Sequence, residues 1–307
     1  MVGYGSQIMR VVYKIRRLSQ PARRRAWKAI YRARYGWPAP PHPRPRDEQP
    51  WLPVVQALLA RWERYHAATV DLTISEHDDM FENGNLRPYL SAGTSALEII
   101  SEAMLLARKT HFGNLLDMPC GYGRVTRHLV KFFPDSAIFV SEVDKAKQRF
   151  CASKFAAEQI DLPADFSGEP VRHFDLIFVG SLLTHLNENL SNDMLHYLVR
   201  ALSEGGLLVF TTCGRHGTVV SAGQGYVEPN ALHRFARKGF VYEGAPTYGS
   251  SRMAPSWVLR TLESMPDARV LGHKEQGWGT LQDVFVIEKD TGWTWPRPLK
   301  PRWPWVA

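Results

Sequence analysis

The sequence predicts an α/β protein built on a seven-stranded, mostly parallel sheet that ends in an antiparallel hairpin, with a helical extension at the N-terminus. Three observations predict this class. Apolar strand-like segments and amphipathic helix-like segments alternate over residues 114–213, which is typical of parallel strands joined by crossover helices. A glycine-rich turn separates the first of these strands from a helix. Two later strand-like segments, 270–274 and 283–288, are joined by a turn containing Gly277 and Gly279, and they predict the hairpin.

The N-terminal extension, residues 1–46, is strongly basic. It holds twelve Lys and Arg and no Asp or Glu, which leaves a net charge of about −4 for the remainder of a chain whose net charge is +8. Apolar residues at helical spacing predict two helices here, over 6–19 and 22–35. Five prolines in 36–45 then predict a stiff linker. Because the remainder is mildly acidic, a broad nucleic-acid-binding face on it is not expected.

Three roles are open for the basic extension. It can lie on an anionic membrane surface, because its arginine-rich faces attract acidic lipids and Trp27 can insert shallowly. It can bind RNA, or it can pack on the body or on a second subunit, so an oligomer remains open. The three cysteines form no Cys-x-x-Cys pair, so no metal site and no disulfide framework are expected. A reducing cytoplasm is therefore the expected location, with a peripheral position at the inner face of the membrane as the alternative. No run of about 18 apolar residues predicts a membrane-spanning helix.

The body, residues 47–290, is predicted as one domain that begins with an amphipathic helix after Trp51. A polar stretch, 75–85, precedes a helix near 94–108. Strands are expected at 114–118, 137–142, 158–162, 174–180 and 207–213, and helices at 123–133, 144–155 and 191–203. Residues 215–265 are rich in Gly, Tyr and Ser and are predicted to form a lid or a wall for the substrate. Residues 291–307 are predicted to be an irregular tail, because Trp and Pro dominate them.

The turn after the first strand has the composition of a nucleotide-binding loop. Gly121 and Gly123 allow a tight turn and let a ligand approach the backbone closely, and a helix that starts here would offer free N–H groups to an anion. Glu142 follows the second strand, where a carboxylate can accept hydrogen bonds from ribose hydroxyls. These features fit a dinucleotide as well as S-adenosylmethionine. A dinucleotide fingerprint would require a third glycine at the position of Thr126.

Four ordered segments resemble the class I S-adenosylmethionine-dependent methyltransferases. Residues 116–124, Leu-Asp-Met-Pro-Cys-Gly-Tyr-Gly-Arg, resemble the first motif of that family, with Pro119 where the family usually has glycine. Glu142 matches the acidic residue after the second strand, and residues 174–186 and 205–212 resemble the fourth-strand and fifth-strand motifs. The similarity covers roughly residues 75–290. It implies a Rossmann-like fold whose sheet ends with an antiparallel strand, and S-adenosylmethionine as the cofactor.

The resemblance also implies where the cofactor contacts lie. The methionyl end would be surrounded by residues of the turn: Asp117, Pro119, Cys120, Gly121, Gly123 and Arg124. Glu142 would bind the ribose and Val143 would touch the adenine, with Asp161 or Asp165 near the adenine amino group. Gly180 and Ser181 would line the far side of the cleft. Met80 and Tyr89 lie where this family places a cofactor-covering helix, and plain packing is an equal alternative for both.

Methyl transfer to a hydroxyl requires a base, and two histidines and an acidic loop supply candidates for it. His185 follows the fourth strand and is the leading candidate, although a histidine there often only binds neighbouring backbone. His216 follows the fifth strand, and Asp79, with Asp78, lies in an acidic loop. The fourth-strand and fifth-strand motifs resemble a branch associated with bacterial glycan and secondary-metabolite genes. A sugar or polysaccharide hydroxyl is therefore the expected acceptor, with RNA, another small molecule, or a scaffold role without turnover as alternatives.

Overall fold

The computed structural model describes residues 51–82, 84–245 and 248–292. The predictions for the basic extension and its linker lie outside the described residues, as does nearly all of the predicted Trp/Pro-rich tail. The chain divides into a first unit that ends at Leu52 and a second unit that begins at Pro53. The architecture below is that of the second unit.

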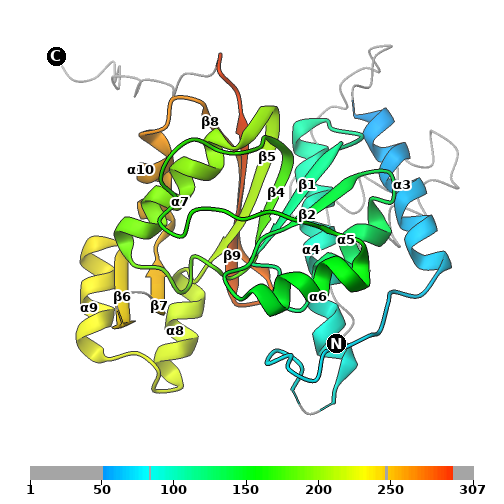
Figure 1. The fold of residues 1–307 in the computed structure, drawn as a ribbon. Coiled ribbons are helices and arrows are strands. Elements are labelled where there is room, and N and C mark those ends of the chain that lie inside the picture. Colours follow the sequence, from blue (N-terminus) through cyan, green and yellow to red (C-terminus); the bar gives the residue numbers. More distant parts are fainter. Residues whose placement is uncertain (1–50, 83, 246–247, 293–307) are drawn as a thin grey trace, which may run out of the picture. The chain divides into compact units, whose positions relative to one another are not determined.

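The second unit contains the predicted seven-stranded mixed sheet (Figure 1). Its strands are β1 (Asn114–Met118), β2 (Ala137–Val140), β3 (Glu158–Gln159), β4 (Phe174–Val179), β5 (Leu202–Thr212), β8 (Ala268–Trp278) and β9 (Gln282–Lys289). Their order in the sheet is β3-β2-β1-β4-β5-β9-β8. The first five strands are parallel, and β9 pairs antiparallel with both β5 and β8. The predicted fold class is confirmed.

Helices cover both faces of this sheet, so each central strand is buried on both sides. The helices are α3 (Leu52–Ala67), α4 (Leu86–Ala107), α5 (Thr126–Phe132), α6 (Lys145–Phe155), α7 (Glu188–Arg200), α8 (Arg215–Gly223), α9 (Pro229–Lys238) and α10 (Pro255–Glu263). Leu115 faces the core shared with α3 to α6. Its neighbour Leu116 faces the core shared with α7 and α10. This alternation is the period-2 pattern of a strand.

Several predicted boundaries are wrong, for helices and also for the strands β3 and β5, and local capping explains two of the helix starts. The helix expected near 94–108 begins at Leu86, because the Asn85 side chain accepts the N–H of Arg87. The helix expected at 191–203 begins at Glu188 after the cap Asn187 and ends at Arg200. The helix expected from Gly123 begins only at Thr126. The turn residues before it therefore lie outside the helix.

The segment 215–265 has more regular structure than its composition predicts. It contains α8, α9 and α10 together with a separate hairpin of β6 (Phe240–Ala245) and β7 (Tyr248–Met253), all on one side of the main sheet (Figure 1). The N–H groups of Gly249 and Ser251 donate to the carbonyls of His185 and Thr184, at 3.1 and 2.7 Å. The hairpin is thereby tied to the loop that follows β4.

The α4 helix is long and apolar enough to cross a membrane by length and composition alone. In this fold its apolar face packs in the core, with Leu97, Ile100 and Met104 fully buried. Gly93 allows close contact with α5, since a Cβ there would lie 2.1 Å from the His128 ring. A core helix of a globular domain has the same length and composition.

A buried histidine packed against α4 is expected to make the free energy of unfolding sensitive to acid. His128 is 1% exposed and its Nδ1 lies 2.6 Å from the Tyr65 hydroxyl. Burial, with help from Arg127 and Lys131, lowers its pKa to about 4. The unfolded chain, with a histidine pKa near 6.5, binds more protons between these values, so the free energy of unfolding falls as pH falls from about 6.5 to about 4.

We expect this histidine to lower the free energy of unfolding by about 2 kcal/mol between pH 7.5 and pH 5. Urea denaturation of the wild type and of His128→Gln at both pH values measures the effect. The comparison cancels the carboxyl groups that also titrate in this range. An equal pH dependence in the two proteins would contradict the assignment.

Candidate active site

The turn between β1 and α5 is built around a buried carboxylate. Asp117 is 1% exposed, and its Oδ2 accepts a hydrogen bond from the Thr126 hydroxyl at 2.6 Å. Burial raises the pKa of the Asp117 carboxyl to about 7; Thr126 opposes this rise and the charge of Glu142 adds to it. Thr126 therefore holds the turn together where a third glycine would only save space. An ionised Asp117 at neutral pH would be stabilised by a cationic group of a ligand.

The two glycines of the turn have different functions. Both have positive φ, +50° for Gly121 and +77° for Gly123, a region that disfavours side chains. A Cβ on Gly121 would meet no described atom within 4 Å, whereas a Cβ on Gly123 would lie 2.3 Å from the Phe155 ring and 3.2 Å from the Cys151 sulfur. Gly123 therefore permits the packing of α6 on the turn. Gly121 instead leaves the space beside its Cα open to a ligand.

Glu142 is hydrogen-bonded to this turn. Its Oε2 accepts the N–H of Gly121 at 3.1 Å, and its Oε1 accepts the N–H of Val143 at 2.8 Å. A carboxylate has about four acceptor positions, so both oxygens keep lone pairs for ligand hydroxyls. Val143 is 86% exposed beside it. The sequence prediction that Glu142 and the glycine turn form one site agrees with this contact.

Two thiols stabilise the same turn through the carbonyl of Gly121. The Sγ atoms of Cys120 and Cys151 both donate to the carbonyl of Gly121, at 3.4 and 3.3 Å. The N–H of Cys120 also donates to Ser141 O at 3.1 Å, which ties the turn to the end of β2. Pro119 follows a cis peptide bond from Met118. These contacts make the cysteines supports of the turn.

Arg127 organises the turn, and the sequence analysis missed it. Its side chain is buried, and its guanidinium donates to five oxygens: Gly123 O (2.9 Å), Tyr122 O (3.2 Å), Asp71 O (3.0 Å), Thr73 O (3.0 Å) and the Tyr89 hydroxyl (3.2 Å). It thus joins the turn to the polar segment before α4. A polar residue on a short helix resembles a surface position in sequence, so no local signal marks it.

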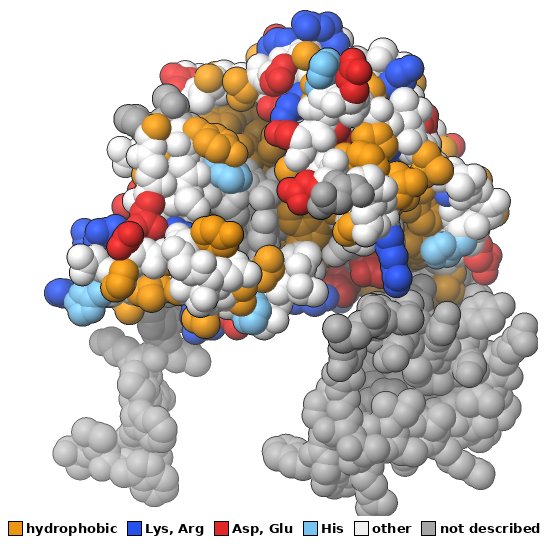
Figure 2. All heavy atoms as spheres, turned by 90° about the horizontal axis from the view of Figure 1, so that it is seen from below, with side chains coloured by type: hydrophobic (Ala, Val, Ile, Leu, Met, Phe, Trp, Pro, Cys, Tyr) orange, Lys and Arg blue, Asp and Glu red, His pale blue; other side chains and the backbone are white. Residues whose placement is uncertain are grey.

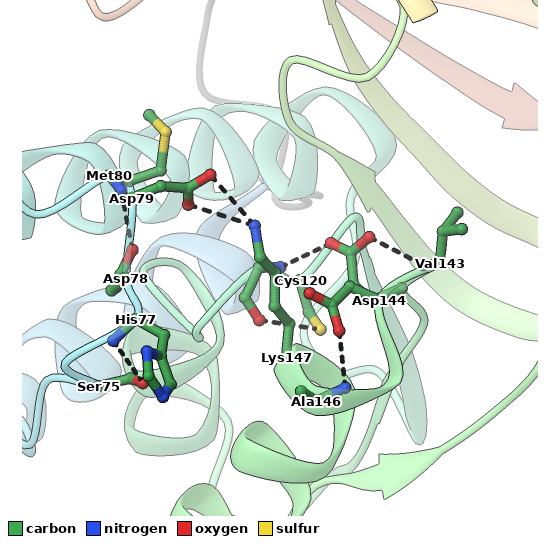
Figure 3. A network of polar contacts seen from close by, with 12 residues as sticks. Ser75, His77, Asp78, Asp79, Met80, Cys120, Val143, Asp144, Ala146 and Lys147 are labelled. Carbon is green, nitrogen blue, oxygen red and sulfur yellow. Dashed lines mark hydrogen bonds and ion pairs between the residues drawn. The ribbon is translucent and has the colours of Figure 1, made fainter. Parts of the chain in front are cut away.

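The segment before α4 lies against the turn between β1 and α5. The Tyr89 hydroxyl donates to Asp78 Oδ2 at 2.5 Å, and burial, with the Asp78 contact, raises the pKa of Tyr89 well above its usual range. Asp79 extends across to Lys147 on α6, at 3.2 Å (Figure 3). Met80 is half exposed. Tyr89 therefore belongs to the buried Arg127 network. Asp79, a candidate base, pairs with Lys147 beside the turn.

Polar side chains lock together the ends of β4, β5 and β9. Ser181 has a φ of +65° and donates its N–H to the Thr211 hydroxyl at 2.8 Å. Gln282 bridges the two, because its Nε2 donates to Ser181 Oγ at 2.8 Å and its Oε1 accepts from Thr211 at 2.6 Å. Gly180 permits close packing, since a Cβ there would lie 3.0 Å from the rings of both Phe178 and Trp278. Thr211 is a site residue that the sequence analysis did not name.

His185 is held in one orientation and one tautomer. Its Nδ1 lies 2.9 Å from the carbonyl of Gly249, and the ring stacks on Tyr248 with centroids 4.6 Å apart and planes 9° apart. Because a carbonyl can only accept, Nδ1 carries the proton and Nε2 keeps its lone pair. The backbone contact foreseen as the alternative is present, and it leaves the other nitrogen able to take a proton. His216 lies in the first turn of α8.

The end of the molecule that holds α6 and α8 is hollowed. Figure 2 looks onto this end and shows a depression with hydrophobic side chains at its border. In open α/β sheets, ligands bind in the crevice beyond the carboxyl ends of the strands. Among the described residues, no group of three or more His, Cys, Asp or Glu is placed to hold a metal ion.

Comparison with known proteins adds likeness of fold at low identity. No family model and no curated protein sequence matches the chain. A S-adenosylmethionine-dependent methyltransferase from Clostridium acetobutylicum has 14% identity and a TM-score of 0.47, covering 66% of this chain and 92% of that one. The magnesium protoporphyrin IX methyltransferase of Synechocystis, solved with bound S-adenosylhomocysteine, has 12% identity and a TM-score of 0.45, covering 76% and 94%.

An O-methyltransferase family protein from Burkholderia thailandensis has 11% identity and a TM-score of 0.44, covering 78% of this chain and 72% of that one. Likeness at these values says nothing about the substrate. In its strand order, its five parallel strands and its closing antiparallel hairpin, the chain has the Rossmann-like fold that the resemblance to class I methyltransferases implied.

Proposed function

We propose that this chain is an S-adenosylmethionine-dependent methyltransferase that methylates a hydroxyl of a sugar or polysaccharide. The observation that carries the proposal is the open space beside the Gly121 Cα, with the Glu142 carboxylate hydrogen-bonded to the Gly121 N–H. The site fits the cofactor chemically. Glu142 can accept from ribose hydroxyls, and Asp117 supplies negative charge for a ligand that bears an ammonium and a sulfonium group. Bound there, S-adenosylmethionine would supply an activated methyl group.

His185 is assigned as the base for the acceptor hydroxyl. Its Nε2 can take the proton as the hydroxyl oxygen attacks, and the Gly249 carbonyl then stabilises the protonated ring through Nδ1. Tyr248, 64% exposed and stacked on His185, offers an aromatic face at the same place. Aromatic faces pack well against the apolar faces of sugar rings. The aromatic face of Tyr248 favours a sugar as the acceptor. The base His185 favours a hydroxyl over a carboxylate, because a carboxylate acceptor would need no base.

The assignment predicts a separation of turnover from cofactor binding. His185→Ala is expected to lower kcat by about 100-fold or more while the Kd for S-adenosylmethionine changes less than twofold. Release of S-adenosylhomocysteine with a panel of glycan acceptors, together with calorimetry of cofactor binding, measures both quantities. His216→Ala is the matched control and should keep turnover.

Full turnover in His185→Ala with intact cofactor binding would exclude His185 as the base. Cofactor binding without product from any glycan would exclude the glycan acceptor. Product from RNA or from an aromatic small molecule would then identify the competing enzyme class. Binding without turnover on every acceptor would indicate a scaffold.

A further inference from the structure

The segment 215–265 forms a cavity whose lining is strongly cationic. The cavity measures about 280 Å³ and lies where the end of α9 and the start of α10 meet the first residue of α8. Four cationic residues line it, from all three helices: Arg215, Arg237, Lys238 and Arg260. The described lining residues include no Asp or Glu. Cations gathered without a counter-charge repel one another, and a bound anion would relieve that repulsion.

Local backbone geometry brings the walls of this cavity together. Gly239 ends α9 with a φ of +78°, and its carbonyl accepts the N–H of Ala254 at 2.7 Å just before α10 starts. A Cβ on Gly239 would lie 3.5 Å from Nη2 of Arg260. The guanidinium of Arg260 therefore rests against the junction of the two helices. This junction fixes one wall of the cavity in position.

The cations differ in how far they are already neutralised. Arg215 donates through Nε and Nη2 to Oε1 of Glu275, at 2.8 and 2.5 Å. Within the described residues, Arg237, Lys238 and Arg260 form no ion pair. Ser256, at the start of α10, adds a hydroxyl beside them. Three uncompensated cations and one hydroxyl around a small volume form a donor set suited to a tetrahedral oxyanion.

We propose that this cavity binds a phosphate group, either free inorganic phosphate or the phosphate of a phosphorylated sugar. Guanidinium groups bind phosphate oxygens through paired hydrogen bonds, and a lysine adds a point charge. The volume suits a phosphate with at most a small attached group, and it is too small for a nucleic-acid strand. The site makes no use of Glu142 or His185, so it stands whether or not the chain transfers methyl groups.

Calorimetry on the full chain in phosphate-free buffer tests the site, with inorganic phosphate titrated at constant ionic strength. Saturable binding to the wild type is expected. Arg260→Ala should weaken it about tenfold, because a paired contact is lost, and the double change Arg237→Ala with Lys238→Ala should abolish it. Arg234→Ala is the matched control, because Arg234 is an exposed arginine of α9 outside the lining, and its Kd should stay within twofold.

In a second arm of the experiment, glucose 1-phosphate is titrated in place of inorganic phosphate, and glucose serves as the sugar without a phosphate. Tighter binding of the sugar phosphate than of inorganic phosphate supports a phosphorylated ligand, and equal binding supports free phosphate. No saturable binding of either phosphate, or an equal loss in Arg234→Ala and Arg260→Ala, would overturn the proposal. Thermal melts without phosphate check each fold, and all these exposed positions should melt as the wild type does.

Discussion

Replacing Arg127 with alanine is expected to lower the free energy of unfolding by about 3–5 kcal/mol and to remove measurable S-adenosylmethionine binding. The side chain is 1% exposed and serves oxygens on two separate segments, the Gly123 turn and the stretch that contains Asp71 and Thr73. Without the guanidinium the buried carbonyls of Tyr122 and Gly123 lose this donor, and each buried unsatisfied group costs about 1–3 kcal/mol. The turn and the segment before α4 then lose their connection.

Chemical denaturation and cofactor calorimetry on the same preparations measure the two effects. Arg149→Ala is the control, because Arg149 is an exposed arginine on the neighbouring helix α6 and should change stability by less than about 0.5 kcal/mol. Arg127→Lys keeps the charge without the planar donor fork, and an intermediate loss is expected. If the free energy of unfolding of Arg127→Ala lies within about 1 kcal/mol of the wild-type value, the buried guanidinium does not support the turn.

The parts of the fold that depend on local pattern could be predicted from the sequence. The alternation of apolar strands and amphipathic helices is a periodic signal, and the cores on the two faces of the sheet require it. Glu142 and Gly121 could be paired in advance, because parallel strands end at the same edge of a sheet. Their hydrogen bond is the structural result of that rule.

The contacts that could not be predicted join residues far apart in sequence. Arg127 bonds to carbonyls 54 and 56 positions earlier, in a stretch without regular structure. The tautomer of His185 depends on Gly249, 64 positions later on a hairpin that composition did not indicate. The Gly, Tyr and Ser content of 215–265 predicted a lid or a wall for the substrate without indicating its helices and hairpin, which form because apolar residues of the segment, such as Trp257, reach the core. Tertiary burial overrides weak local propensity there.

Substitutions at the two glycines of the turn are expected to have opposite effects on cofactor affinity and on stability. Gly121→Asp is expected to weaken S-adenosylmethionine binding by at least about 100-fold, while its free energy of unfolding falls by only about 1 kcal/mol, since Asp tolerates positive φ and the space is open. The new carboxylate would occupy the ligand space beside Glu142. Gly123→Ala should do the reverse and cost about 2–4 kcal/mol of stability, because its Cβ would overlap the Phe155 ring.

Glu142→Ala completes this test at the ribose end of the site. Its loss removes the acceptor for the N–H of Gly121 and for that of Val143, and affinity for S-adenosylmethionine should fall by about 100-fold, as for a charged hydrogen-bonding partner. Glu142→Gln keeps one acceptor oxygen and should lose less. The assignment requires Gly121→Asp and Glu142→Ala to lose binding in a folded protein. Unchanged affinity in both variants would show that the cofactor does not bind at this turn, because both changes act on the open space beside Gly121 and on the carboxylate bonded to it.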